Sequence, residues 1–217
     1  MIGESPKPMA EVHEEPFLNI ILKHLRGQGI KRVVLCAGYK GEVVEEYYRD
    51  HDLGLDIQVS LENKPLGTGG AIALARQRIS SQPFLVLNGD SFCSIDYQKF
   101  LEFHRKQKAL ASMAIVQVKD QKDFGVVALD PSKRIVGFYE KSYLKAPGKN
   151  LTTGINAGIY LFNQNIFGEF PKKSSFGLEY DVFQKMQNRD FYGFEVREDF
   201  IDIGTPERFK LAQTFLK

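Results

Sequence analysis

Hydrophobic residues in the first half of the chain follow a pattern that predicts strands and helices in alternation. Residues 16–26 carry apolar side chains at helical spacing and end near Gly27 and Gly29, as helices commonly do. Residues 32–37 form a continuous apolar run, which predicts a buried strand. The other elements expected up to Lys108 are a helix at 42–49, a strand at 55–61, a helix at 71–79, a strand at 84–87 and a helix that Asp96 caps.

The second half of the chain predicts shorter strands separated by turns. Strands are expected at 111–118, 125–129, 134–140, 156–162, 192–196 and 200–203, with a helix at 178–188. The last helix begins at Thr205-Pro206, with threonine as N-cap and proline at the first helical position. The expected fold is therefore α/β and Rossmann-like, with a mixed, mostly parallel sheet and helices on both faces.

Length and composition narrow the class of protein. The 217 residues contain no linker or repeat, which predicts one domain over 1–217, with halves at about 1–110 and 111–217. A net charge of +2, with both signs interspersed, argues against a nucleic-acid partner. The sequence has neither a membrane-spanning run nor a signal-peptide core, and two lone thiols fit a cytoplasmic protein, with Cys36 in the core.

Two aspartates follow short apolar runs that lie far apart in the sequence. Asp90 comes after residues 84–87, and Asp202 lies in the run Phe200-Ile-Asp-Ile-Gly-Thr. Ligands of open α/β sheets collect outside the carboxyl ends of the strands, where two carboxylates suit a hard divalent cation. Each aspartate alone is equally well explained by a turn or by a hydrogen bond to a neighbouring backbone amide.

Glycine and proline mark two candidate phosphate or nucleotide contacts. The segment Pro65-Leu-Gly-Thr-Gly-Gly-Ala71 lies between a strand and a helix, where glycines allow close approach and helix N-terminal amides attract anions. An ordinary turn explains it equally well. Lys7 lies between Pro6 and Pro8, which predicts an ammonium group displayed on a stiff extended segment or, more simply, an exposed lysine in a loop.

A third group of polar residues lies in the second half. Glu140-Lys141 ends one expected strand, and Asn156 begins another in Gly154-Ile-Asn-Ala-Gly-Ile-Tyr160. Carboxylate, ammonium and amide groups could hold sugar hydroxyls and a phosphate, although Glu-Lys pairs are common on surfaces. Gly125 would let a sugar ring approach the backbone. Glu179 and Asp181 fall in the first turn of an expected helix, where the helix dipole explains them.

These motifs occur in an order that resembles the sugar-1-phosphate nucleotidylyltransferases over essentially the whole chain. The order is PKPM, LGTGGA, NGD, a Gly-Val-Val strand, EK, NAGIY and IDIGT. Within that family the chain is most similar to the bacterial guanylyltransferases that act on D-glycero-D-manno-heptose 1-phosphate, followed by those that act on mannose 1-phosphate.

The resemblance implies a nucleotidyltransferase fold with a nucleotide-binding first half and a sugar-binding second half. It implies Mg²⁺ held by Asp90 and Asp202, with Lys7 on phosphate. The implied nucleotide contacts are Glu62, Leu66, Gly67, Thr68, Gly69, Gly70 and Asn88, and the implied sugar-phosphate contacts are Gly125, Glu140, Lys141 and Asn156. The substrates would be a nucleoside triphosphate, by resemblance GTP, and a sugar 1-phosphate, in a chain that could form a homo-oligomer.

The sequence departs from the family pattern at its start. The family opens with a strand and a glycine-rich loop of the form GGxGTRL, and residues 1–6 contain neither. The strands at 32–37 and 84–87 are therefore expected to leave a gap between them, and transferase activity is expected to be impaired. The chain could begin upstream, another segment could fill the gap, or the protein could tolerate the loss.

Two other functions fit the sequence. A non-catalytic module could keep the pocket and bind sugar nucleotides without chemistry. A glycosyltransferase could also use a nucleotide-binding half with carboxylates on a metal, but Asn88-Gly89-Asp90-Ser91 lacks the paired acids of an Asp-x-Asp motif.

Overall fold

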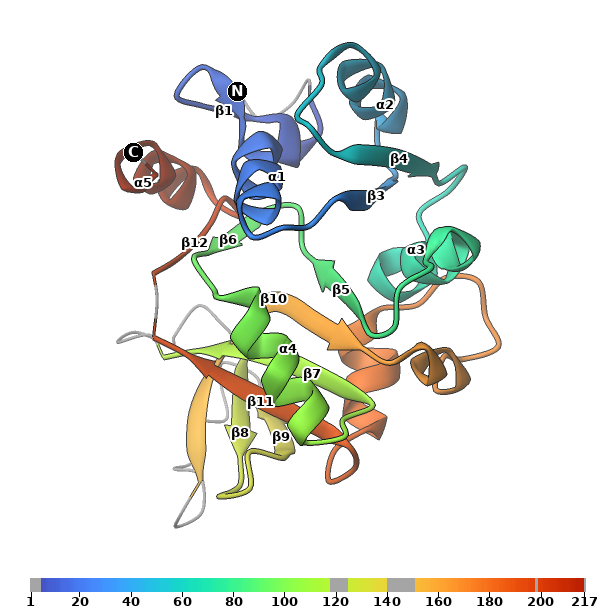
Figure 1. Ribbon diagram of the computed structural model, residues 1–217, viewed down its shortest axis with the longest axis vertical. Coiled ribbons are helices and arrows are strands. Elements are labelled where there is room, and N and C mark those ends of the chain that lie inside the picture. The colour runs from blue at the N-terminus through green and yellow to red at the C-terminus, as the bar shows by residue number, and fades with distance from the viewer. Residues whose placement is uncertain (1–4, 118–124, 140–150, 198, 217) are drawn as a thin grey trace.

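The largest sheet is built around one long strand. The computed structural model describes residues 5–117, 125–139, 151–197 and 199–216. The strand order is β11-β7-β10-β8-β9, and β5 also pairs with β10 (Figure 1). These strands are β5 (Phe84–Leu87), β7 (Ala111–Val116), β8 (Val126–Leu129), β9 (Ile135–Tyr139), β10 (Thr152–Phe162) and β11 (Phe191–Val196). Because β10 pairs with both β5 and β7, strand pairing joins the two halves of the chain.

The other strands in the described residues form three separate two-stranded sheets. They join β1 (Glu11–Val12) to β2 (Glu15–Pro16), β3 (Arg32–Ala37) to β4 (Asp56–Leu61), and β6 (Ser91–Cys93) to β12 (Phe200–Asp202). The expectation of a mostly parallel arrangement is wrong for these residues. Only β3–β4 and β7–β11 are parallel there, because β10 runs antiparallel to β5, β7 and β8.

The central strands are buried on both faces. Successive side chains of a strand point to opposite faces, and in β7 they enter two different hydrophobic clusters. Met113 and Ile115 pack in one cluster with Phe183, whereas Ala114 and Val116 pack in the other. A continuous apolar run therefore marks a strand covered on both sides, as the sequence pattern predicts.

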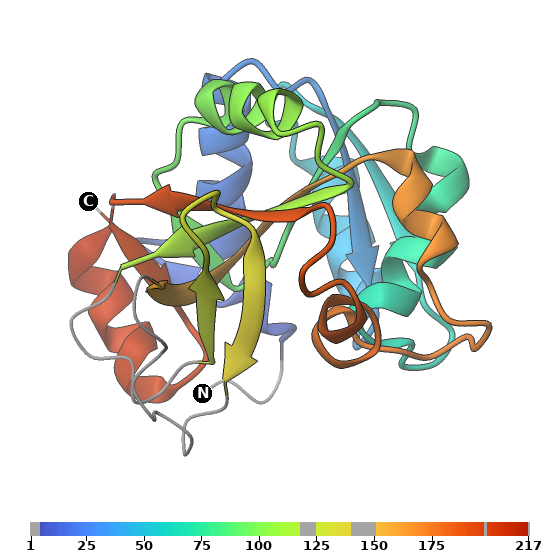
Figure 2. The same cartoon turned by 90° about the horizontal axis from the view of Figure 1, so that it is seen from below.

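Helices cover both sides of the sheet, as expected. The α-helices are α1 (Phe17–Gly27), α2 (Gly41–Asp50), α3 (Gly67–Ala75), α4 (Tyr97–Lys106) and α5 (Pro206–Phe215). Figure 2 shows α4 above β7 and β11, and the Phe100 ring of α4 packs at a tilted angle against that of Phe194. On the other face lie the short helices η4 (Leu178–Val182) and η5 (Phe183–Lys185), with Phe183 against Tyr160. None of the helices in the described ranges is long and apolar enough to cross a membrane.

Some elements differ from those that the sequence predicts. Helix α3 begins at Gly67 rather than at residue 71, so the glycines form its first turn. The helix expected at 178–188 is a π-helical turn followed by a 3₁₀ turn. Cys36 is exposed rather than in the core, although its strand has the expected bounds.

Strand β3 has hydrogen-bonded neighbours on one edge only within the described residues. It pairs with β4, and β5 pairs with β10, but β3 and β5 do not pair with each other. The middle residues of both strands, among them Leu35 and Val86, are only half-buried, which is unusual for such apolar runs. As expected, the two strands are therefore not paired with each other in this part of the fold.

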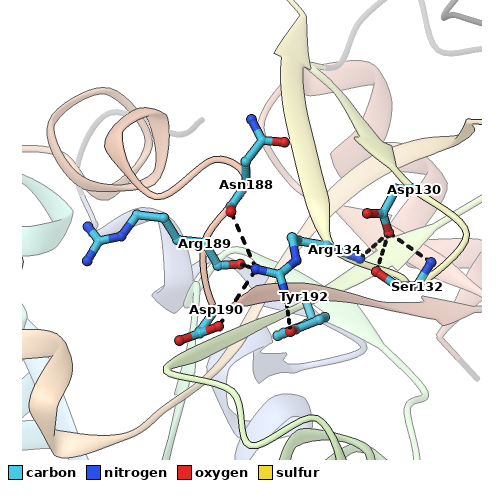
Figure 3. Close-up of polar contacts among 7 residues, drawn as sticks. All are labelled: Asp130, Ser132, Arg134, Asn188, Arg189, Asp190 and Tyr192. Atoms are coloured by element: carbon cyan, nitrogen blue, oxygen red, sulfur yellow. Dashed lines mark hydrogen bonds and ion pairs between the residues drawn. The ribbon is translucent and has the colours of Figure 1, made fainter.

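An arginine joins the β8–β9 hairpin to the segment that precedes β11 (Figure 3). The Arg134 guanidinium donates to the carbonyl oxygen of Arg189 at 2.8 Å and to the Tyr192 hydroxyl at 2.8 Å. The hairpin turn is closed by Asp130, whose carboxylate accepts from the amides of Ser132 and Arg134. These contacts fix the hairpin at the end opposite to Gly125.

A buried histidine makes the stability of the fold depend on pH. His104 lies on α4 with 3% of its surface exposed, and its Nδ1 is 2.8 Å from the Ser112 hydroxyl. Burial, with a smaller contribution from Arg105, lowers the pKa of His104 from 6.5 to about 4. The folded state thus keeps this side chain neutral between these values, while the unfolded chain takes up a proton.

The stabilisation from His104 is expected to be present above pH 6.5 and lost as the pH falls toward 4. Between pH 7 and pH 5 the free energy of unfolding should fall by about 2 kcal/mol more in the natural protein than in a His104→Gln variant. Urea denaturation at the two pH values measures this difference. Equal pH dependence of the free energy of unfolding in both proteins would contradict the lowered pKa of His104.

Candidate functional site

The two candidate metal ligands, distant in sequence, lie on paired strands. Asp202 ends β12 and pairs with Ser91 of β6, while Asp90 directly precedes Ser91. The Ile203 amide donates to the Asp90 carbonyl oxygen at 3.0 Å, which fixes the two backbones side by side. Asp90 is partly exposed, whereas Asp202 is buried with 8% of its surface exposed.

Lys7 lies beside the first of these aspartates. Its Nζ is 3.7 Å from Asp90 Oδ2, and both side chains are partly exposed. The segment is a 3₁₀ turn over Lys7–Met9 and not the expected extended one, because the Met9 amide donates to the Pro6 carbonyl oxygen. The turn is held next to Gly89, where an added Cβ would lie 3.3 Å from Pro8.

Two amides of the glycine-rich segment 65–71 are already hydrogen-bonded within the protein. The amides of Gly69 and Gly70 both donate to the Phe176 carbonyl oxygen, at 3.0 and 3.2 Å. A Cβ on Gly69 would lie 2.3 Å from the Phe176 ring, and one on Gly67 would lie 2.7 Å from the Phe176 carbonyl oxygen. These glycines allow residues 174–178 to pack against α3, which is a structural reason for the motif.

Two groups in or just before this segment are placed where they could contact a nucleotide. The Thr68 hydroxyl accepts from the Leu178 amide at 2.9 Å, and both residues line a pocket. Glu62 follows β4, is half-buried and accepts from the Leu66 amide at 2.9 Å. Its carboxyl group is near Gly38 at the end of β3, so it lies at the carboxyl edge of two parallel strands.

A break in the pairing of β10 positions two asparagines. The register between β10 and β7 shifts between Asn156 and Tyr160, and Gly158 within the shift has φ +71°. The Gly158 amide donates to Asn156 Oδ1, and its carbonyl oxygen accepts from the Asn88 amide at 2.8 Å. Irregular strand pairing of this kind often re-aims side chains beside active sites.

The break opens onto a pocket of about 310 Å³. Its lining residues are Thr68, Asn88, Tyr160, Gly177, Leu178, Glu179 and Tyr180. Tyr180 is largely exposed, and burial raises the pKa of Tyr160, so its hydroxyl remains protonated. The pocket thus combines aromatic walls with a small number of polar groups, as small-molecule sites usually do.

Glu179 is a pocket residue that the sequence interpretation assigned only to a helix dipole. Asn156 Nδ2 donates to Glu179 Oε1 at 3.1 Å and to the Tyr160 hydroxyl at 2.8 Å. The Asn156 amide is therefore hydrogen-bonded to its neighbours, and Glu179, which is exposed, lines the pocket. Its spacing from Asn156 in the sequence gives no sign of this contact.

The other expected sugar-side residues are placed only in part. Val126 of β8 pairs with Ile155 of β10, so Gly125 lies across from Asn156 in the register and is exposed. An added Cβ at Gly125 would meet no atom within 4 Å. Glu140 and Lys141 lie outside the described residues.

The carboxylate groups of Asp90 and Asp202 are suitable ligands for a divalent cation that keeps part of its water shell. Carboxylate oxygens are the donors that Mg²⁺ prefers, and two protein ligands with phosphate oxygens make a usual Mg²⁺ site. No group of three or more His, Cys, Asp and Glu side chains within the described ranges is placed to hold a metal ion. Asp202 already has a partner, because Arg208 Nη1 lies 2.8 and 2.7 Å from its two carboxylate oxygens.

Comparison with known proteins matches this chain along its length. A family model described as nucleotidyl transferase matches residues 3–217. A D-glycero-alpha-D-manno-heptose 1-phosphate guanylyltransferase of Aneurinibacillus thermoaerophilus is 36% identical over 218 residues, covering 100% of this chain and 92% of the relative. A mannose-1-phosphate guanylyltransferase of Mycobacterium tuberculosis is 35% identical, covering 94% of this chain and 57% of the relative.

Solved structures agree with the sequence comparison. HddC from Yersinia pseudotuberculosis, complexed with GMP-PN, superposes with a TM-score of 0.85 at 32% identity and covers 99% of this chain and 92% of its own. The inositol-1-phosphate CTP transferase from T. maritima superposes with a TM-score of 0.73 at 18% identity, covering 98% and 87%. The second likeness concerns the fold alone.

Proposed function

This chain belongs to the nucleotidyl transferase family, and we propose that it joins GTP to a sugar 1-phosphate of the heptose or mannose type. The products would be a GDP-sugar and pyrophosphate. The observation that carries the proposal is the placement of Asp90 and Asp202 on paired strands, near a pocket that Asn88 lines. The 36% identity to a heptose 1-phosphate guanylyltransferase supports guanine and heptose. The cytoplasmic location expected from the sequence is part of this proposal.

The reaction would be an in-line displacement at phosphorus. A phosphate oxygen of the sugar 1-phosphate attacks the α-phosphorus of GTP, and the bond from that phosphorus to the bridging oxygen of pyrophosphate breaks. Such chemistry needs positioning and charge neutralisation more than it needs a covalent nucleophile. The Lys7 ammonium beside Asp90 is placed to neutralise phosphate oxygens as charge moves.

A divalent metal ion is typical of the family, and the finer assignment to Mg²⁺ on Asp90 and Asp202 is part of this proposal. Bound there, Mg²⁺ supplies positive charge to the phosphate oxygens. The chain's own groups orient the two substrates. Glu62 would contact the base, Asn88 and Thr68 the nucleotide, and Gly125 and Glu179 the sugar, while Asn156 positions Glu179.

Pyrophosphate release from GTP tests the proposed function. We expect release with D-glycero-D-manno-heptose 1-phosphate or mannose 1-phosphate in the presence of Mg²⁺, at the impaired rate that the sequence predicts, and none after addition of EDTA. Binding of GDP-sugar with no pyrophosphate formed would favour a non-catalytic sugar-nucleotide-binding module. Sugar transfer from a GDP-sugar to an acceptor alcohol would favour a glycosyltransferase.

Replacing Glu179 tests whether this residue contacts the sugar 1-phosphate. A Glu179→Gln variant is expected to raise the KM for the sugar 1-phosphate about tenfold, because a hydrogen bond to a charged group is worth about 1.5–3 kcal/mol. The KM for GTP should remain unchanged. Glu46→Gln on the exposed face of α2 is the matched control. A KM for the sugar phosphate within twofold of the natural protein would remove Glu179 from the site.

A further inference from the structure

Arg208 forms an ion pair with Asp202, whose carboxylate the proposed cation would also bind. Its Nη1 lies 2.8 Å from Asp202 Oδ1 and 2.7 Å from Oδ2, so one nitrogen bridges both oxygens. A cation at the proposed site would need this same carboxylate. The Gly204 amide donates to Asp202 Oδ1 at 2.8 Å, which holds the carboxylate in this orientation.

The position of Arg208 in its helix is unfavourable for the helix itself. Thr205 caps α5 by accepting from the Arg208 amide, so Arg208 lies in the first helical turn. The N-terminal end of a helix carries partial positive charge and favours acidic side chains. The arginine is therefore explained by its contact with Asp202 and not by helix stability.

Each of the two aspartates already has a cationic partner. Asp90 has Lys7 at 3.7 Å, and Asp202 has Arg208 at 2.7 Å. Two carboxylates and two cationic groups sum to zero. A free divalent cation would therefore enter a neutral site and face two positive groups, whereas a cation already bound to a triphosphate brings net negative charge.

We propose that Arg208 makes the Asp90–Asp202 site select a metal–nucleotide complex over the free ion. In the absence of nucleotide, the guanidinium holds Asp202 and opposes cation binding. When the complex binds, its phosphate oxygens offer the guanidinium a second anionic partner, and Asp202 becomes available to the metal. This role rests on the proposed function, because it takes the site to be one for a nucleotide with its cation.

Binding of Mn²⁺ alone, followed by electron paramagnetic resonance of the free ion, tests this role without any turnover. The natural protein is expected to bind Mn²⁺ weakly. An Arg208→Gln variant should bind it at least about tenfold more tightly, because a positive charge within a few ångströms has been removed. An Arg208→Lys variant keeps the charge and should remain close to the natural protein. Equal or weaker binding by Arg208→Gln would overturn the proposal.

Arg189→Gln is the matched control, because Arg189 makes a two-bond ion pair with Glu169, which lies outside the Asp90–Asp202 site. Its Mn²⁺ affinity should not change. Since Arg208→Gln leaves a buried carboxylate without its partner, that variant could fail to fold. Side-chain NMR of the natural protein then decides: Arg208 signals should shift when Mg²⁺ and GTP are added together and remain in place with Mg²⁺ alone. Signals that shift fully with Mg²⁺ alone would overturn the proposal.

The two proposals fail separately. Pyrophosphate release with unchanged Mn²⁺ affinity in Arg208→Gln would remove the role of Arg208 and leave the proposed function. Tighter Mn²⁺ binding without any pyrophosphate release would keep the charge competition at Asp202 and remove the transferase activity.

Discussion

Replacing Asp90 with asparagine is expected to lower Mg²⁺-dependent pyrophosphate release by about 100- to 1,000-fold, because loss of one pre-positioned charged group at a reacting centre typically has that effect. The cation would retain Asp202 as its only carboxylate ligand from the proposed pair. The variant should also need more Mg²⁺ for half-maximal turnover. Steady-state assays over a range of Mg²⁺ concentrations measure both effects.

Asp90 is a better position for this test than Asp202. The side chains of Asp90 and Lys7 are 37% and 41% exposed and 3.7 Å apart, and exposed pairs of this kind contribute little to stability. Asp202 is buried against Arg208, so its replacement would disturb folding as well as binding. Asp56→Asn, at an exposed ion pair with Arg32, is the matched control. Turnover of Asp90→Asn within threefold of the control would exclude Asp90 as a metal ligand.

The sequence was sufficient to predict those elements that depend only on residues close to each other in the chain. Asp96 accepts from the Lys99 amide and Thr205 accepts from the Arg208 amide, so both expected helix caps are confirmed. Continuous apolar runs also gave β3 and β5 with the correct bounds. A cap or a buried strand needs only a few consecutive residues, and those residues carry the signal themselves.

Contacts between distant segments could not be predicted in this way. The motif at residues 67–70 predicted a ligand loop, which stays a prediction, but it gave no sign of the contact with Phe176, more than a hundred residues away. Glu179 of η4 lines the pocket beside Asn156 of β10, and its hydrogen bond with that residue joins segments far apart in the sequence. The antiparallel course of β10 likewise depends on which strands surround it and not on its own residues.

The family assignment succeeded for a different reason. The order of the motifs along the chain is a property of the whole sequence, so weak local signals combine into a specific pattern. Comparison with known proteins confirms the family. The roles of individual residues do not follow from that order alone, as Arg208 shows: its contact with Asp202 exists only because α5 follows β12 directly.

Replacing Gly158 with alanine is the second change with a large expected effect. Gly158 has φ +71°, where a residue with a side chain is strained by about 1–2 kcal/mol. An added Cβ would lie 2.6 Å from Asn88 Nδ2 and 2.8 Å from Asn88 Cγ. We expect the free energy of unfolding to fall by about 2–4 kcal/mol and the affinity for GTP to fall about tenfold, because Asn88 must leave its place in the pocket.

Gly154→Ala separates the two effects of this change. Gly154 lies in the same strand without positive φ, and its added Cβ would lie 2.6 Å from Ile115 Cγ2 and 2.7 Å from the Val116 carbonyl oxygen. It should therefore destabilise the fold while leaving Asn88 in position. Calorimetric titration with GTP, together with urea denaturation of both variants, makes the comparison. If Gly158→Ala binds GTP as tightly as Gly154→Ala, Asn88 does not contact the nucleotide, and the break in β10 serves the fold alone.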